Sequence, residues 1–130
     1  MNAEYLNTYF KIPGHRAEDL PAEFAIVTAF NPEGKGQSIE TNLALDSDLA
    51  AQIQKRSLQS WRVIGGSRDF AHTEPGYAIK VDLAVGIEIG VQFRQEAIFW
   101  IEGGNLHLVD CASHQQTLMG EWKLRLLQTP

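Results

Sequence analysis

Acidic and basic side chains are concentrated in the stretch 65–76, which reads GGSRDFAHTEPG and lies between two apolar segments. His72 and Glu74 are two residues apart, so in an extended segment their side chains project to the same side. Asp69 is near enough in the sequence to join them. Such a group could bind a divalent metal, or it could act as a general base with its orienting carboxylate. We therefore take Asp69, His72 and Glu74 as the candidate catalytic residues.

The same residues also have a purely structural interpretation. Asp69 could close the loop through hydrogen bonds to its own backbone, while His72 and Glu74 fasten the loop to the core. His-x-Glu followed by Pro75 is similar to one half of the zinc deaminase signature, but the other half needs a Pro-Cys-x-x-Cys run. The chain has one cysteine, so we assign no metal ligands. The cofactor stays unknown, and the sequence does not decide whether the protein is an enzyme.

A second polar loop, residues 30–38, follows an apolar strand-like run and precedes a predicted helix. Glycines in that position can hold an anion on backbone N–H groups, although Gly34-x-Gly36 completes neither a P-loop nor a dinucleotide fingerprint. The alternative is a simple connector that begins with an Asn31-Pro32 turn. The candidate ligand-binding residues are Asn31, Gly34, Asn42, Arg68 and Gln95.

The segment between Asp48 and Asp69 has no acidic residue but contains four basic ones, Lys55, Arg56, Arg62 and Arg68. Lys55 and Arg56 suit the last turn of a helix, where cations interact favourably with the helix dipole. The other interpretation is a local anion site in which Arg62 or Arg68 binds a phosphate or carboxylate. The sequence therefore predicts a small anionic ligand if the loops form a site.

Cys111 has His107, Asp110 and His114 nearby in the sequence, an arrangement that could serve a thiol nucleophile. It closes an apolar strand, where a small buried residue is usual, so we interpret it as structural. A single cysteine allows no internal disulfide, and a reducing compartment fits best.

The candidate residues must be positioned by a small set of elements. We predict a strand over 24–30 that is buried on both faces, a helix over 38–57 capped by Ser38 or Thr41, and a short strand over 61–64. Residues 97–109 read as a hairpin turned by Gly103-Gly104. Residues 121–127 read as a last strand at an edge of the sheet, with Lys123 and Arg125 facing water.

The segment 79–93 is ambiguous. Apolar residues alternate strictly from Ile79 to Phe93, which predicts a strand. A helix capped by Asp82 is the alternative, although Gly86 and Gly90 would each cost it about 1 kcal/mol relative to alanine. Periodicity alone favours the strand.

Composition limits the class of protein. The chain has 130 residues, of which 44% are hydrophobic and 21% charged, as in ordinary globular domains. We expect one domain over 1–130, with an irregular lead-in at 1–22 and a core at 24–127. A net charge of -5 argues against broad nucleic-acid binding. Apolar runs are too short to span a bilayer, and the N-terminus does not read as a signal peptide, so we expect a cytoplasmic protein without membrane contact.

Several short motifs resemble those of a known family. They are TAFNPxG at 28–34, Asn42 in the following helix, HxEP at 72–75 and QxAIF at 95–99. In this order they are similar to a bacterial family of uncharacterised proteins, domain of unknown function 3293, over roughly residues 24–110. The resemblance implies a helix over 82–93, against the alternation. It implies no activity.

These observations predict an α+β fold: a single domain with a mixed, largely antiparallel sheet of about five strands and two packed helices. One hypothesis is a small enzyme or ligand-binding domain with a polar pocket between the Asn31–Gly34 loop and the Asp69–His72–Glu74 loop. The alternative is a non-catalytic protein-interaction module whose polar loops are structural. An edge strand could also support a homo-oligomer. A cleft would favour the first hypothesis, and a flat apolar surface the second.

Overall fold

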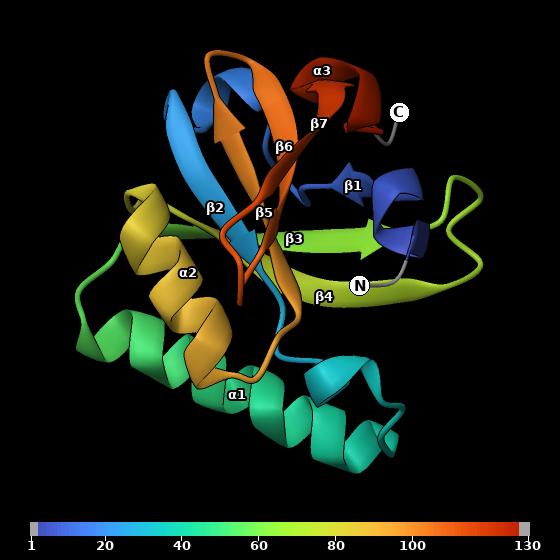
Figure 1. Ribbon diagram of the computed structural model, residues 1–130. Helices are drawn as coiled ribbons and strands as arrows, with labels where there is room; N and C mark the ends of the chain where they lie inside the picture. The colour runs from blue at the N-terminus through green and yellow to red at the C-terminus, as the bar shows by residue number, and fades with distance from the viewer. Residues whose placement is uncertain (1–2, 128–130) are drawn as a thin grey trace.

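One antiparallel sheet of seven strands organises the chain, which the computed structural model describes over residues 3–127 (Figure 1). The order across the sheet is β1-β3-β4-β2-β5-β6-β7. The strands are β1 (Tyr9–Lys11), β2 (Glu23–Val27), β3 (Ser60–Gly66), β4 (Thr73–Ile79), β5 (Ala97–Glu102), β6 (Asn105–Asp110) and β7 (Gln116–Glu121). The sheet curves into a half-barrel, so it has a convex and a concave face.

The central strand β2 is buried on both faces, as predicted. Ala25 and Val27 belong to the apolar cluster beneath the helices, while Phe24 and Ile26 belong to the cluster on the concave face. This division follows from the period of two in a strand. The predicted hairpin is also confirmed, because β5 and β6 pair around Gly103 and Gly104, which both have positive φ.

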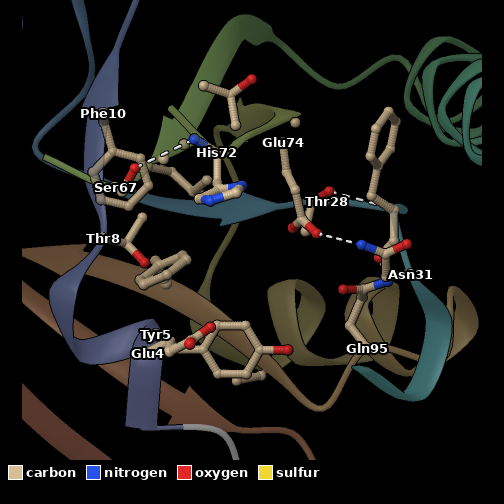
Figure 2. Close-up of a pocket in the computed structure, with 18 of the residues that line it drawn as sticks. Glu4, Tyr5, Thr8, Phe10, Thr28, Asn31, Ser67, His72, Glu74 and Gln95 are labelled. Atoms are coloured by element: carbon tan, nitrogen blue, oxygen red, sulfur yellow. Dashed lines mark hydrogen bonds between the residues drawn. The ribbon is translucent and has the colours of Figure 1, made fainter. Parts of the chain in front are cut away.

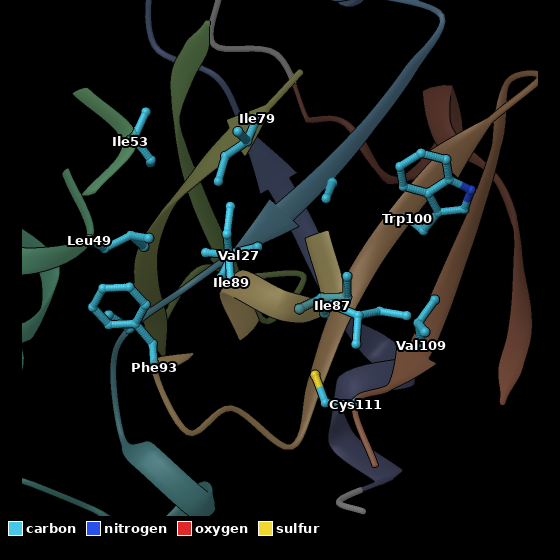
Figure 3. Close-up of a cluster of buried hydrophobic side chains, with 13 residues drawn as sticks. Val27, Leu49, Ile53, Ile79, Ile87, Ile89, Phe93, Trp100, Val109 and Cys111 are labelled. Atoms are coloured by element: carbon cyan, nitrogen blue, oxygen red, sulfur yellow. The ribbon is translucent and has the colours of Figure 1, made fainter. Parts of the chain in front are cut away.

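Helix α1 (Ile39–Lys55) lies on the convex face, close to the predicted bounds. The Ser38 side chain accepts a hydrogen bond from the Thr41 amide and so caps the helix. Leu49 and Ile53 enter the core beneath the helices (Figure 3). Nη1 and Nη2 of Arg62 on β3 donate to the two carboxylate oxygens of Asp46 on α1, at 2.8 and 2.9 Å, and this buried carboxylate ties the helix to the sheet.

Helix α2 (Leu83–Gln92) occupies the segment whose alternation favours a strand, so the periodicity prediction is wrong and the family resemblance is right. The Asp82 carboxylate caps the helix by accepting from the Val85 amide at 2.8 Å. The glycines face the sheet: a Cβ on Gly90 would lie 2.6 Å from Ile98 Cγ2, and one on Gly86 would lie 2.8 Å from Ala25 Cβ. The two glycines allow helix α2 to pack closely against the sheet. Hydrophobic periodicity carries no information about such close packing.

Other predictions of secondary structure need correction. The sheet has seven strands rather than about five, its strand pairs are all antiparallel rather than mixed, and the structure has three α-helices rather than two. The expected loop 65–76 is mostly strand, because β3 and β4 pair through Gly66↔Thr73. The expected irregular lead-in at 1–22 contains β1, which pairs with β3. It also contains two short 3₁₀ helices, η1 (Ala3–Asn7) and η2 (Ala17–Asp19).

The last strand is also misplaced in the sequence analysis. Strand β7 ends at Glu121, and Trp122–Arg125 forms the short helix α3 instead of an edge strand. Gly120, with a φ of 108°, allows the chain to change direction there. The Trp122 side chain then turns into the concave core, where it contacts Phe10 and Phe24. Burial of this indole explains why the segment leaves the sheet.

The two ends of the described chain meet across the half-barrel. The Leu127 amide donates to the Phe10 carbonyl at 2.7 Å, and Phe10 and Leu126 form an isolated parallel bridge. Arg125 Nη1 donates to the carbonyls of Leu6 and Thr8 at 2.9 and 3.0 Å. Arg125 therefore does not simply face water, as expected from the sequence. Its contacts hold η1 and β1 over the concave face.

Candidate functional site

A cavity of about 1000 Å³ lies on the concave side of the half-barrel. Its apolar floor is formed by side chains from strands of the sheet, namely Phe10, Ile26, Val63, Phe99 and Leu108. Polar side chains gather at one wall and at the mouth, as Figure 2 shows. Gly65 and Gly76 also line the cavity. A Cβ on Gly65 would contact the cavity residues Thr8 and Phe10, whereas one on Gly76 would lie 2.6 Å from the Val27 carbonyl oxygen. An apolar cavity with a few converging polar groups is the usual form of a small-molecule site.

Asn31 joins the two polar loops. Its Nδ2 donates to Glu74 Oε1 at 2.8 Å, across 43 positions of sequence. Asn42 on α1 holds it in place, because Asn42 Nδ2 donates to Asn31 Oδ1 and the Asn31 amide donates to Asn42 Oδ1, both at 2.9 Å. Asn31, Asn42 and Glu74 all line the cavity. We call this pair the Asn31–Asn42 lock, because its two hydrogen bonds hold Asn31 in the position from which it donates to the Glu74 carboxylate.

Glu74 is the most chemically distinctive group of this wall. Burial raises the pKa of its carboxyl, and the hydrogen bond from Asn31 offsets only part of this effect. Among the residues that the structure describes, Oε2 of Glu74 has no hydrogen-bond donor. No lysine or arginine is found among the described residues that line the cavity. The carboxylate is thus partly desolvated, and the described residues that line the cavity supply no lysine or arginine to it.

His72 lies two residues from Glu74 and also lines the cavity. Its backbone is fixed, because the His72 amide donates to Ser67 Oγ at 3.4 Å and the His72 carbonyl accepts from the Ser67 amide at 3.1 Å. The imidazole itself is exposed and makes no hydrogen bond within residues 3–127. Figure 2 shows the ring in the cavity beside Glu74. His72 is free to contact a ligand.

Asp69 and Arg68 do not line the cavity. The Asp69 carboxylate accepts from Ser67 Oγ at 2.8 Å and from the Ala71 amide at 3.0 Å, and these bonds lower the pKa of Asp69. Asp69 therefore closes the β3–β4 turn, in the way the structural interpretation describes. The guanidinium of Arg68 lies over the Tyr9 ring at 5.8 Å. Arg62 is held by Asp46 on the convex side.

The Asn31–Gly34 loop uses its backbone N–H groups internally. The amides of Asn31, Glu33, Gly34, Lys35 and Gln37 all donate to protein oxygen atoms. These donors are therefore not available to an anion. Gly34 lines the cavity and has a φ of 72°, and a side chain there would collide with Glu96. This arrangement supports a connector that positions Asn31, rather than an anion-binding loop.

Gln95 lies at the far side of the same wall. It is buried, and its Nε2 donates to the carbonyls of Phe30 and Phe93 at 3.2 and 3.3 Å. These two bonds occupy the amide donors and leave Oε1 as an acceptor beside the cavity (Figure 2). Gln95 can therefore accept a hydrogen bond from a polar group near Glu74.

The sequence analysis missed the contribution of the N-terminal segment. Glu4, Tyr5 and Thr8 line the cavity from η1 and the residue that precedes β1. In Figure 2 the Tyr5 hydroxyl points toward the side of the cavity that holds Glu74 and Gln95. Burial, together with Glu96, Glu74 and Cys111, raises the pKa of Tyr5 to about 12. The aromatic content of this segment was the available signal.

Cys111 lies in the core beneath α2 and does not line the cavity. Burial, with a smaller effect from Asp110, raises the pKa of its thiol to about 11. A buried, protonated thiol is a poor nucleophile. This agrees with the structural interpretation of Cys111.

The geometry limits the chemistry that the wall can perform. Within residues 3–127, no group of three histidine, cysteine, aspartate or glutamate side chains could hold a metal ion. No carboxylate in this range is hydrogen-bonded to His72, and Asp69 is committed to the turn. A base with its orienting carboxylate is therefore not assembled. Glu74, Gln95, His72 and Tyr5 can instead hydrogen-bond a ligand in the cavity.

Comparison with known proteins agrees with the sequence motifs. The model of the family described as "Protein of unknown function (DUF3293)" matches residues 27–98, more than half of the chain. The chain belongs to this family. The matched DUF3293 segment includes Asn31, Asn42, His72, Glu74 and Gln95, whereas Tyr5 precedes it. No curated protein and no solved structure matches the chain.

The sequence also led us to expect that the chain does not span a membrane. In the part of the chain that the structure describes, no helix has the length and apolar character needed to cross a membrane.

Proposed function

We propose that this protein is a small-molecule-binding domain whose ligand occupies the concave cavity of the half-barrel. The observation that carries the proposal is the cavity itself, about 1000 Å³ in volume, with an apolar floor and a polar wall. This volume lies at the upper end of the range typical of ligand pockets, roughly 300–1000 Å³. A ligand would place its apolar part against Phe10, Val63 and Phe99, and a polar group at Glu74.

Binding is favoured over catalysis by the state of the polar groups. Asp69, one of the three candidate catalytic residues, is committed to the turn, and within residues 3–127 no carboxylate is hydrogen-bonded to the His72 imidazole. Glu74 is held rigidly by Asn31 and Asn42. Rigid polar groups at the edge of an apolar cavity fix a ligand's orientation without performing a reaction. The buried unpaired Cys111 supports a reducing compartment such as the cytoplasm.

Filling the cavity tests the proposal. Ala97 lines it from β5, so Ala97→Phe would place a ring in the ligand space. A thermal-shift screen with cationic, neutral and anionic fragments, followed by titration calorimetry, would identify ligands of the unaltered protein. We expect Ala97→Phe to lower their affinity at least about tenfold, which corresponds to 1.4 kcal/mol. The matched control is Ala44→Phe, because Ala44 is exposed on α1 and does not line the cavity.

His72→Ala separates a ligand contact from a structural anchor. Because the imidazole is exposed and unbonded within the described residues, its removal should change the free energy of unfolding by less than about 0.5 kcal/mol. Fragment affinity should nevertheless fall. Unchanged affinity in Ala97→Phe, or a screen in which no fragment perturbs residues of the cavity, would refute the binding proposal.

The protein-interaction alternative retains one supporting observation. Leu118 on the edge strand β7 and Leu124 on α3 are 62% and 71% exposed. A second chain could pair with this edge, and the same edge would support a homo-oligomer. Sedimentation of the protein with and without Leu118→Lys tests the oligomer directly. A concentration-dependent mass that the substitution abolishes would favour this function.

A further inference from the structure

We propose that the ligand carries a cationic amine on an apolar body, with the amine bound at Glu74. This inference rests on the proposed binding function and names the chemical class that the cavity takes. It reverses the charge that the arginines of the sequence suggest, because neither Arg62 nor Arg68 lines the cavity.

The first argument is that Glu74 accepts one hydrogen bond and has no cationic partner within residues 3–127. A carboxylate taken out of water is costly unless a cation or several donors compensate it. The protein supplies one donor within residues 3–127, Asn31 Nδ2 on Oε1, and directs no lysine or arginine into the cavity. The Asn31–Asn42 lock keeps the carboxylate in this position. A ligand ammonium would provide the missing compensation at Oε2.

The second argument is the arrangement of acceptors around Glu74. Gln95 Nε2 donates to the carbonyls of Phe30 and Phe93, so the side chain presents its Oε1 acceptor to the cavity. An ammonium has three donors and no acceptor, so it can use Glu74 and Gln95 together. A ligand carboxylate would meet Glu74 with the same charge, and the amides of Asn31, Glu33, Gly34, Lys35 and Gln37 already donate to protein oxygen atoms. The wall therefore discriminates between these two head groups.

The third argument is the field at the wall. Burial is the largest cause of the raised pKa of Tyr5, and the negative charges of Glu96 and Glu74 raise this pKa further. Phe10, Phe99 and Val63 also line the cavity and give it an apolar surface. A negative head-group site facing an apolar floor fits an amine with an alkyl or aromatic body.

Three matched probes test the inference. Phenethylamine, phenethyl alcohol and 3-phenylpropionate have similar apolar bodies and carry a cationic, a neutral and an anionic head group. Titration followed by two-dimensional NMR at neutral pH gives each dissociation constant and the residues perturbed. We expect the amine to bind at least about tenfold more tightly than the carboxylate, with shifts at Glu74, Gln95 and Phe99.

Substitution then assigns the preference to one residue. Glu74→Gln keeps an oxygen for Asn31 and removes the charge, so the amine should lose its advantage over the alcohol. Glu18→Gln removes the same charge at an exposed position outside the cavity and should leave the preference intact. The spectrum of each variant shows directly whether it is folded.

The outcomes distinguish the two proposals. If no probe of any charge perturbs the cavity, the binding function fails, and this inference fails with it. If the alcohol or the carboxylate binds as tightly as the amine, or if Glu74→Gln keeps the amine preference, the cationic ligand is refuted. In that case the binding function stands.

Discussion

Glu74 and Asp69 are both carboxylates of the same hairpin, yet their environments have opposite effects on them. Asp69 is exposed and accepts two hydrogen bonds, so its pKa is lowered. Glu74 is partly buried with one bond, and its pKa is raised. Hydrogen bonds within the turn therefore account for Asp69, and burial at the cavity wall accounts for Glu74.

The raised pKa of Glu74 makes a prediction about stability and pH. In the window between the unfolded and the raised folded pKa, the folded state binds more protons than the unfolded state. The free energy of unfolding therefore falls as pH increases through this window. Glu74→Gln removes the effect, so the variant should melt above the unaltered protein at neutral pH. The two melting temperatures should converge under acid conditions.

Thermal unfolding monitored by circular dichroism between acid and neutral pH measures this difference. The control is Glu18→Gln, which changes the net charge equally at an exposed position. If Glu74→Gln is less stable than the unaltered protein at neutral pH, the carboxylate has a stabilising partner that this reasoning omits.

At the scale of elements, helix α2 depends on contact with the sheet more than on its own propensity. Gly86 and Gly90 are poor helix formers, but both are buried and both would collide with the sheet if they carried a Cβ. The glycines lower the helix propensity of α2 but let it lie close to the sheet. Ile87 and Ile89 are thereby buried in the core (Figure 3). Packing therefore selects the helix.

Gly90→Ala tests this balance. In an exposed helix the substitution would stabilise by about 1 kcal/mol. Here the new Cβ would lie 2.6 Å from Ile98 Cγ2 and 3.1 Å from Cys111 Sγ. We expect a loss of about 1–3 kcal/mol in the free energy of unfolding, measured by urea denaturation. Gln92→Ala, on the exposed face of α2, should change it by less than about 0.5 kcal/mol. A stabilised Gly90→Ala protein would contradict the packing account.

At the scale of the whole molecule, contacts between the two ends of the described chain cover the half-barrel. Arg125 donates to the carbonyls of Leu6 and Thr8, and Leu127 donates to Phe10. Tyr5 and Thr8 line the cavity from the segment that these bonds secure. The site therefore includes a segment held by residues more than a hundred positions away.

Arg125→Ala should loosen this cover. Loss of the guanidinium removes the donor from the exposed Leu6 carbonyl and from the partly buried Thr8 carbonyl, and should cost about 1–3 kcal/mol. Hydrogen exchange should accelerate in residues 5–11 and remain unchanged in β5 and β6. Lys123→Ala, at a neighbouring exposed residue of α3, is the matched control. Equal protection of the N-terminal segment in both variants would show that Arg125 does not secure it.

The sequence by itself determined the local structures whose causes lie within a few residues. Ser38 and the apolar spacing of Leu49 and Ile53 specified helix α1, and the Gly103-Gly104 turn specified the β5–β6 hairpin. Continuous apolar character specified the buried strand β2. The motifs also specified the family. Capping, turn geometry and burial of a short run are local effects, so a sequence expresses them directly.

The tertiary structure decided the features that depend on distant partners. Alternation in 79–93 matched a strand, but the fit of Gly86 and Gly90 against β2 and β5 selected a helix. Burial of Trp122 against Phe10 and Phe24 turned the expected last strand into α3. Tyr5 entered the site because the N-terminal segment folds over the concave face. Which carboxylate faces the cavity, and whether a cation accompanies it, depends on solvation and contacts that only the folded sheet creates.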